Sequence, residues 1–203
     1  MTRSKRTAIE IDVLVVSDRW NDPATAEAMV RRAVTHAAAA TPSTGATELA
    51  IVLTDDSAIR LLNRDWRNVD AATNVLSFPA KSANGKILGG HLGDIVLAFE
   101  TIAREAREAR KPFAHHVAHL AVHGFLHLVG YDHERNADAV AMEHTERAIL
   151  RRLAIPDPYR PRNRHPAAGT TTARAAIKKA GKRVAKPPAK YSAARAGRRS
   201  RKS

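Results

Sequence analysis

The distribution of charge divides this chain into two parts with different folding capacities. Residues 158–203 contain 15 of the 34 Lys and Arg residues and no Asp or Glu, whereas residues 1–157 carry 19 basic and all 20 acidic side chains. The second part is rich in Ala and Pro and has few bulky apolar residues, so it cannot bury enough surface to offset its ordering entropy. We predict one folded domain at 1–157 and a disordered basic tail at 158–203.

Hydrophobic periodicity in the first part predicts a single α+β domain. Apolar, β-branched runs indicate a small mixed sheet, with strands at 8–16, 47–54, 73–79 and 92–100. Helical patterns occupy 22–40, 55–67, 99–111, 112–129 and 134–154. Asp22 and Pro23 suit the N-cap and first position of the first helix, and "KSANGK" at 81–86 suits a hairpin tip. The expected order is βαβαββααα.

The amino-acid composition also limits the expected location of the protein and the types of metal ligand that it can offer. The chain has no cysteine, which excludes disulfides and thiolate zinc sites. No stretch approaches the ~20 apolar residues of a membrane span, and Glu10 and Asp12 interrupt the apolar run that follows the basic N-terminus. We therefore expect a cytoplasmic protein that does not associate with a membrane.

Four histidines recur at every fourth position of the helix expected at 112–129, namely His115, His119, His123 and His127. Steps of four keep side chains on one helix face and separate neighbours by ~6 Å along the axis. Gly130 suits the left-handed conformation that ends a helix, so the ring of His133 can turn back over the last helical turn. Three neutral imidazoles with an open fourth position are typical of a catalytic zinc site. We expect one Zn²⁺ per chain, held by His123, His127 and His133.

Other polar residues are weaker candidates around this site. We expect His119 to support the ligands or to face the substrate as a catalytic group, rather than to be a fourth ligand. Asp132 is expected either to cap the helix that starts near 134 or to orient a ligand. Asp94 lies in an apolar strand and is expected either to support the site or to form a turn. His115 and His116 are expected on the helix surface.

The ligand spacing also matches a class of zinc metallopeptidases, H-E-x-x-H-x-x-G-x-x-H, with Gly130 in register. In those enzymes the Glu activates the attacking water. Gly124 stands at that position here and has no side chain to act as a base. A metallopeptidase is therefore a disfavoured alternative.

Three separated motifs resemble the YbeY family of bacterial single-strand-specific endoribonucleases and rRNA maturation factors. They are "LLNRDWRNVDAATNVLSFP" at 61–79, "LGDIVLA" at 92–98 and "HLAVHGFLHLVGYDH" at 119–133. The resemblance implies an α+β fold, a zinc ion on the three histidines, and an essential arginine, which falls on Arg67. It also implies a role in 16S rRNA 3′-end processing, ribosome assembly and ribosome quality control. Expected partners are single-stranded RNA, small-subunit rRNA, the small ribosomal subunit with its proteins, and an Era-type GTPase.

The chemistry of the residues is compatible with that function. A zinc ion can polarise a phosphate or activate water, and an arginine offers paired donors to phosphate oxygens. Whether water or the RNA's own 2′-hydroxyl attacks is left open. The alternative is a non-catalytic assembly factor in which zinc only stabilises the fold; closure of the fourth position by His119 would favour it.

The basic tail is expected to contact RNA phosphates without sequence preference and with strong salt dependence. The candidate contacts are Arg174, Lys178, Lys179, Lys182, Arg183, Lys186, Arg198 and Arg199. A merely solubilising extension is the alternative. On this interpretation, deletion of 158–203 weakens RNA binding and leaves the zinc site and the fold intact.

Overall fold

The computed structural model describes residues 9–42, 44–80, 90–133 and 135–160. The predicted order βαβαββααα and the α+β class are confirmed. The strands are β1 (Glu10–Val15), β2 (Glu48–Thr54), β3 (Val75–Pro79) and β4 (His91–Ala98), and the helices are α1 (Pro23–Ala40), α2 (Asp56–Arg67), α3 (Phe99–Glu108), α4 (Phe113–Leu128) and α5 (Asn136–Arg152). The predicted hairpin tip at 81–86 and the tail from 161 lie outside the described residues. None of the described helices has the length and apolar character needed to cross a membrane.

The four strands form one mixed sheet in the order β1-β2-β4-β3. β2 pairs in parallel with both β1 and β4, and β3 pairs antiparallel with β4. Six of the seven residues of β2 are buried, as expected for an inner strand covered on both faces. β3 is an edge strand, and α4 packs against it and against β4.

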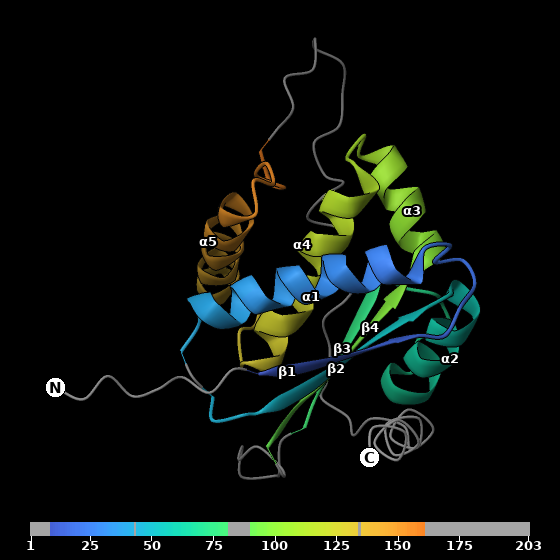
Figure 1. The fold of residues 1–203 in the computed structure, drawn as a ribbon, viewed down its shortest axis with the longest axis horizontal. Helices are drawn as coiled ribbons and strands as arrows, with labels where there is room; N and C mark the ends of the chain where they lie inside the picture. Colours follow the sequence, from blue (N-terminus) through green and yellow to red (C-terminus); the bar gives the residue numbers. More distant parts are fainter. Residues whose placement is uncertain (1–8, 43, 81–89, 134, 161–203) are drawn as a thin grey trace, which may run out of the picture.

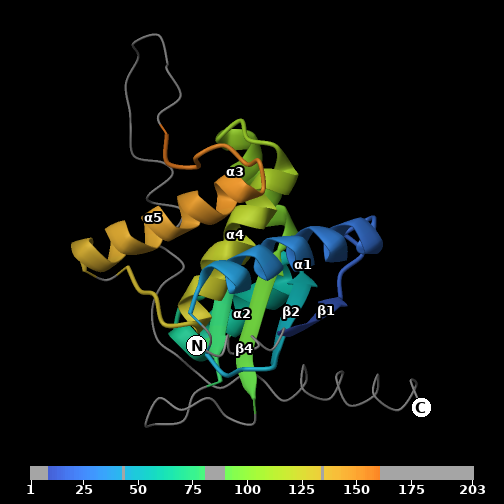
Figure 2. The same ribbon diagram turned by 60° about the vertical axis from the view of Figure 1, so that its left-hand side comes forward.

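The two faces of the sheet are covered unequally, because alternate strand residues point to opposite sides. Ile51, Ile95 and Leu97 belong to the main core, which also includes residues of α1, α3, α4 and α5. Val52 and Val96 point to the other face, where α2 packs with its apolar side. Figures 1 and 2 show α1 lying across α4 on the main-core side.

The central helix α4 is the main support of the candidate site. From His116 to Leu126 every residue is buried, so only its ends are open to solvent. His116 was expected on the surface, but it is 6% exposed and bonds to Glu105 of α3, with 2.9 Å between Nε2 and Oε2. The carboxylate gives this buried ring a partner, which makes its burial tolerable.

Local signals explain where helices begin and end. Asp22 caps α1 as predicted, since its Oδ1 accepts from the amide of Thr25 at 3.1 Å, and Pro23 opens the helix. Gly130 adopts a φ of +101° directly after α4, and the amide of Tyr131 closes the turn onto the carbonyl of Leu126 at 2.9 Å. This is the helix-ending turn that the sequence predicted, and it reverses the chain toward His133.

Candidate metal centre

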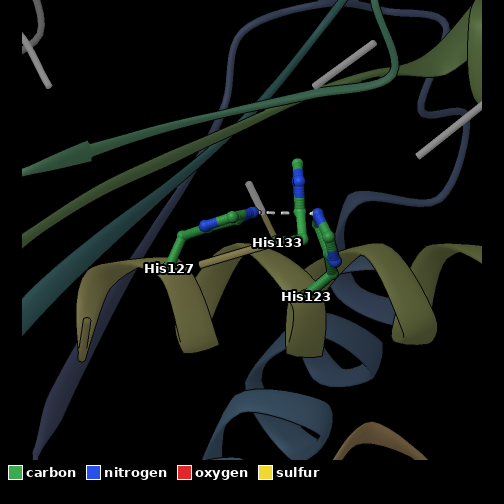
Figure 3. Close-up of side chains that lie close together, drawn as sticks. All are labelled: His123, His127 and His133. Atoms are coloured by element: carbon green, nitrogen blue, oxygen red, sulfur yellow. Dashed lines mark hydrogen bonds between the residues drawn. The ribbon is translucent and has the colours of Figure 1, made fainter. Parts of the chain in front are cut away.

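The structure brings His123, His127 and His133 together. His123 and His127 lie one turn apart on α4, and His133 follows the turn at Gly130 (Figure 3). One ring nitrogen from each residue lies within 4.8 Å of the other two. The rings of His123 and His133 are stacked, and the ring of His127 stands edge-on to both. Three side chains from two segments therefore present donors to one point.

Hydrogen bonds fix which nitrogen each ring offers. Nδ1 of His127 lies 3.0 Å from the carbonyl oxygen of Tyr131, and Nδ1 of His123 lies 2.7 Å from Oε1 of Glu146. Both oxygens only accept hydrogen bonds, so each Nδ1 carries the proton and each Nε2 keeps its lone pair. These two Nε2 atoms are 3.1 Å apart, which places lone pair against lone pair.

A divalent cation fits this arrangement. Two facing lone pairs repel unless a proton or a metal ion lies between them. The Nε2 atom of His133 is buried and has no hydrogen-bond partner among the described residues. It can therefore serve as a third ligand atom beside His123 and His127. Three imidazoles suit Zn²⁺ and other borderline transition-metal ions, and ligands of this kind are usually oriented by a hydrogen bond at their other nitrogen.

The electrostatics keep the rings of His127 and His133 neutral, as ligation requires. Burial, followed by the neighbouring His123 and His133, lowers the pKa of His127 to about 3. Burial and the neighbouring His123 also lower the pKa of His133. Both side chains therefore offer free lone pairs at neutral pH without first losing a proton.

Glu146 of α5 is the central support of the centre. It is 0% exposed, and its two oxygens have separate partners. Oε1 accepts from His123, and Oε2 lies 3.0 Å from Nε2 of His119 and accepts from the hydroxyl of Tyr159. Burial alone would raise the pKa of Glu146, but the interactions with His123 and His119 outweigh it and lower that pKa. A buried carboxylate with this many partners is a fixed anion beside the metal ligands.

His119 is buried beside Glu146, and its expected role at the substrate stays a prediction. Its side chain is buried, with the residue 3% exposed, and its Nε2 points to Glu146 rather than to the three ligand nitrogens. Burial is the largest of the effects that lower the pKa of His119. His119 therefore bonds to the same carboxylate as His123 and is not one of the three clustered rings.

The structure removes one of the two roles expected of each aspartate, and the supporting role of each stays a prediction. Asp132 does not cap α5, because that helix begins at Asn136 with Arg135 at its N-cap and no side-chain cap bond. Its Oδ1 instead accepts from the amide of His133 at 2.6 Å, in the turn that carries the third ligand. Asp94 lies within β4, not in a turn, and its Oδ1 is 3.1 Å from Nε2 of His91.

The position of Asp94 in the strand separates it from α4. Val96, two residues further along β4, points to the α2 face of the sheet, whereas Ile95 points to the face that α4 covers. Because Asp94 is in phase with Val96, we place it on the α2 face of the sheet, where its described contact is the hydrogen bond to His91. A supporting role of Asp94 at the metal centre stays a prediction.

Arg67 is the last residue of α2, and its side chain is partly buried. Burial lowers the pKa of Arg67 from its ordinary value of 12.5, yet a guanidinium remains a cation at neutral pH. α2 packs on the sheet face opposite α4. Contact between Arg67 and a substrate at the metal centre stays a prediction.

Gly124 faces the sheet rather than the metal centre. A Cβ atom at this position would lie 2.9 Å from Cγ2 of Ile95 and 3.0 Å from Oγ of Ser77. The hydroxyl of Ser77 also donates to the carbonyl of Gly124 at 3.2 Å. The glycine therefore allows α4 to approach the sheet closely, and a glutamate here has no room to enter.

Sequence reasoning missed Glu146 and Tyr159. A usable signal existed for the first: Met142, Glu146 and Ile149 fall at helical spacing, and the two apolar residues are buried. A glutamate on the apolar face of an amphipathic helix requires a buried partner. No comparable pattern marks Tyr159, which follows α5 in an irregular segment. The eight tail residues proposed for RNA binding lie outside the described residues.

The fold and the cluster define an α+β protein with a candidate three-histidine metal centre. The chain belongs to the YbeY family, because the family profile for endoribonuclease YbeY matches residues 14–154. A protein named endoribonuclease YbeY from Nitrobacter winogradskyi is 53% identical over 169 residues, covering 81% of this chain and 88% of its own length. Another protein of that name from Rhodopseudomonas palustris strain BisB18 is 52% identical over 168 residues, covering 81% of this chain and 99% of its own.

Among solved structures, the solution structure of a Thermotoga maritima protein is similar to this chain. It has a TM-score of 0.48 and 19% sequence identity, covering 78% of this chain and 99% of the other.

Proposed function

We propose that this protein is a single-strand-specific, zinc-dependent endoribonuclease that matures the 3′ end of 16S rRNA and acts in ribosome assembly and quality control. Membership of the YbeY family supports RNA as the substrate. The observation that carries the metal dependence is the convergence of three imidazole donors, two of them with Nδ1 held by fixed acceptors. The small ribosomal subunit, its proteins and an Era-type GTPase are the proposed partners, and the cytoplasm is the proposed location.

In this proposal the residues divide into three roles. His123, His127 and His133 hold the metal ion, which would polarise the scissile phosphate. Arg67 supplies a cation with paired donors for phosphate oxygens. Glu146 holds the ring of His123 in one orientation, so that the donors are in place before the ion binds.

The structure favours this function over the alternatives. A purely structural zinc closed by His119 is disfavoured, because that ring is bonded to Glu146. A metallopeptidase is disfavoured because position 124 packs against the sheet and cannot carry a catalytic glutamate.

Cleavage of a labelled single-stranded RNA and of the matching duplex tests the function. Wild type, His127→Ala and the matched control His144→Ala, at an exposed position of α5, are each assayed with and without a chelator, and the product ends are identified. We expect wild type and His144→Ala to cleave the single strand only, and chelator or His127→Ala to abolish cleavage. Equal cleavage in all samples would exclude the metal-dependent nuclease.

Arg67 is tested separately in the same assay. Arg67→Lys keeps the positive charge but removes the paired donors, and we expect cleavage to fall by about 10²-fold, the usual effect of removing one donor from the transition state. Arg64→Lys, at an exposed position of the same helix, is the control. Unchanged cleavage by Arg67→Lys would remove the arginine from the site.

A further inference from the structure

The segment that follows α5 contacts Glu146, the carboxylate that bonds to His123 of the candidate metal centre. The hydroxyl of Tyr159 donates to Oε2 of Glu146 and lies 3.5 Å from Nε2 of His119, while Oε1 of Glu146 accepts from His123 at 2.7 Å. We propose that Tyr159 is a positioning residue of the metal centre, which locks the carboxylate of Glu146 and, through it, the ring of His123. The proposal rests on the proposed role of His123 as a metal ligand.

The direction of the hydrogen bonds makes the hydroxyl necessary. A carboxylate only accepts, so Tyr159 must donate, and a buried carboxylate is costly unless its lone pairs are satisfied. Burial, and then the charge of Glu146, raise the pKa of Tyr159, so the hydroxyl keeps its proton. Without this hydroxyl, Oε2 retains His119 alone, and the carboxylate gains freedom to rotate away from His123.

The ring of Tyr159 is held by contacts that do not involve its hydroxyl. The guanidinium of Arg147 lies 4.8 Å from the centre of the ring and also pairs with Asp157, with 3.3 Å between Nε and Oδ1. Lys111 donates to the carbonyl of Pro158 at 2.9 Å, and Pro158 is buried. The segment is thus docked through several contacts, and Tyr159→Phe removes the hydroxyl while preserving the docking.

Pro158 and Tyr159 lie just beyond the domain boundary expected at 157. They contact Lys111, in the turn before α4, and residues of α4 and α5. On this proposal the metal centre depends on Tyr159, so a functional domain would extend at least to that residue.

The proposal is tested by measuring the zinc affinity of the full-length chain in competition with a chromophoric chelator. The visible spectrum of bound Co²⁺ is the second readout. Tyr159→Phe is compared with wild type, with His127→Ala and with Tyr191→Phe, the matched change in the tail. We expect Tyr159→Phe to weaken affinity about 10-fold, within the usual effect of losing an outer support of a ligand, and to alter the Co²⁺ spectrum. Tyr191→Phe should match wild type.

The outcomes separate the two proposals. If Tyr159→Phe binds zinc with wild-type affinity and an unchanged Co²⁺ spectrum, the positioning role is overturned, even if its thermal stability falls. If His127→Ala binds as tightly as wild type, the proposed metal site itself fails. To guard against a folding defect, circular dichroism must show native helix content for Tyr159→Phe, and Tyr159→Leu, which has no side-chain donor, must also weaken binding.

Discussion

Nδ1 of His123 lies 2.7 Å from a carboxylate oxygen of Glu146, and both residues are buried. One helix supplies the imidazole and another supplies its acceptor, so the packing of α5 on α4 sets the orientation of a candidate metal ligand.

Glu146→Gln keeps the size of the side chain and removes its charge. The amide oxygen can still accept from His123, but its NH₂ group cannot accept from Tyr159 or His119. We expect zinc affinity to fall by about 10- to 100-fold. Chelator competition measures this, and Glu108→Gln, at an exposed position of α3, is the control. Wild-type affinity in Glu146→Gln would show that the carboxylate does not support the ligand.

Gly124→Ala should destabilise the fold despite the better helix propensity of alanine. The new methyl group would meet Cγ2 of Ile95 at 2.9 Å, and overpacking of this kind costs about 1–3 kcal/mol, against a gain of about 1 kcal/mol from helix propensity. Urea unfolding in the presence of chelator measures the difference.

A double-mutant comparison identifies the cause of that effect. Ile95→Ala removes the methyl group that the new Cβ would meet most closely, so Gly124→Ala should cost less stability in the Ile95→Ala background, where the contact with Oγ of Ser77 remains. The same loss of stability in both backgrounds would show that close packing on Ile95 is not the reason for the glycine.

The metal-free protein should lose stability as the pH falls from 6.5 to 5. His127 has a pKa of about 3 when folded, against an ordinary value of 6.5, and the pKa of His133 and of His119 is lowered in the same direction. Between these values the unfolded chain binds more protons than the native chain, so protonation favours unfolding. Each such group contributes a slope of at most about 1.4 kcal/mol per pH unit.

Urea unfolding at several pH values, with chelator present, measures this slope. The shifted pKa of Glu146 does not interfere, because that carboxyl contributes only below its ordinary value of 4.5. His127→Gln should reduce the slope, and His144→Ala should change it little. Stability that is constant or rises between pH 6.5 and 5 would contradict the neutral, buried state of these rings.

Two truncations separate the tail from the end of the domain. A chain that ends at Arg160 loses 14 basic residues but keeps Tyr159. We expect it to bind zinc as wild type does, to bind single-stranded RNA more weakly, and to lose about 0.7 from the salt slope for each phosphate contact removed. A chain that ends at Asp157 should in addition lose zinc affinity. Identical salt slopes with and without residues 161–203 would exclude the tail from RNA binding.

The sequence predicted those features that depend on short spacings. Asp22 and Pro23 marked the start of α1, and Gly130 marked the turn after α4, because caps and turns are local in sequence. The cluster of His123, His127 and His133 was predicted for the same reason, since helical periodicity and one turn determine where they meet.

The features that the sequence did not predict depend on packing between distant segments. Glu146 lies 23 residues from His123, and only the register of α5 on α4 places its carboxylate beside that ring. The helical row suggested that His119 shares the site of His123, but Glu146 lies between them and bonds to both. The strand pattern likewise did not show on which face of the sheet Asp94 lies.

The most direct test of the account is a titration of the metal-free, full-length protein with Zn²⁺, followed by calorimetry. The account predicts one ion per chain in wild type and in His144→Ala. It predicts loss of that binding event in His123→Ala, His127→Ala and His133→Ala, each with native helix content. Undiminished binding of one ion in all three ligand variants, or no binding in wild type, would contradict the three-histidine metal centre.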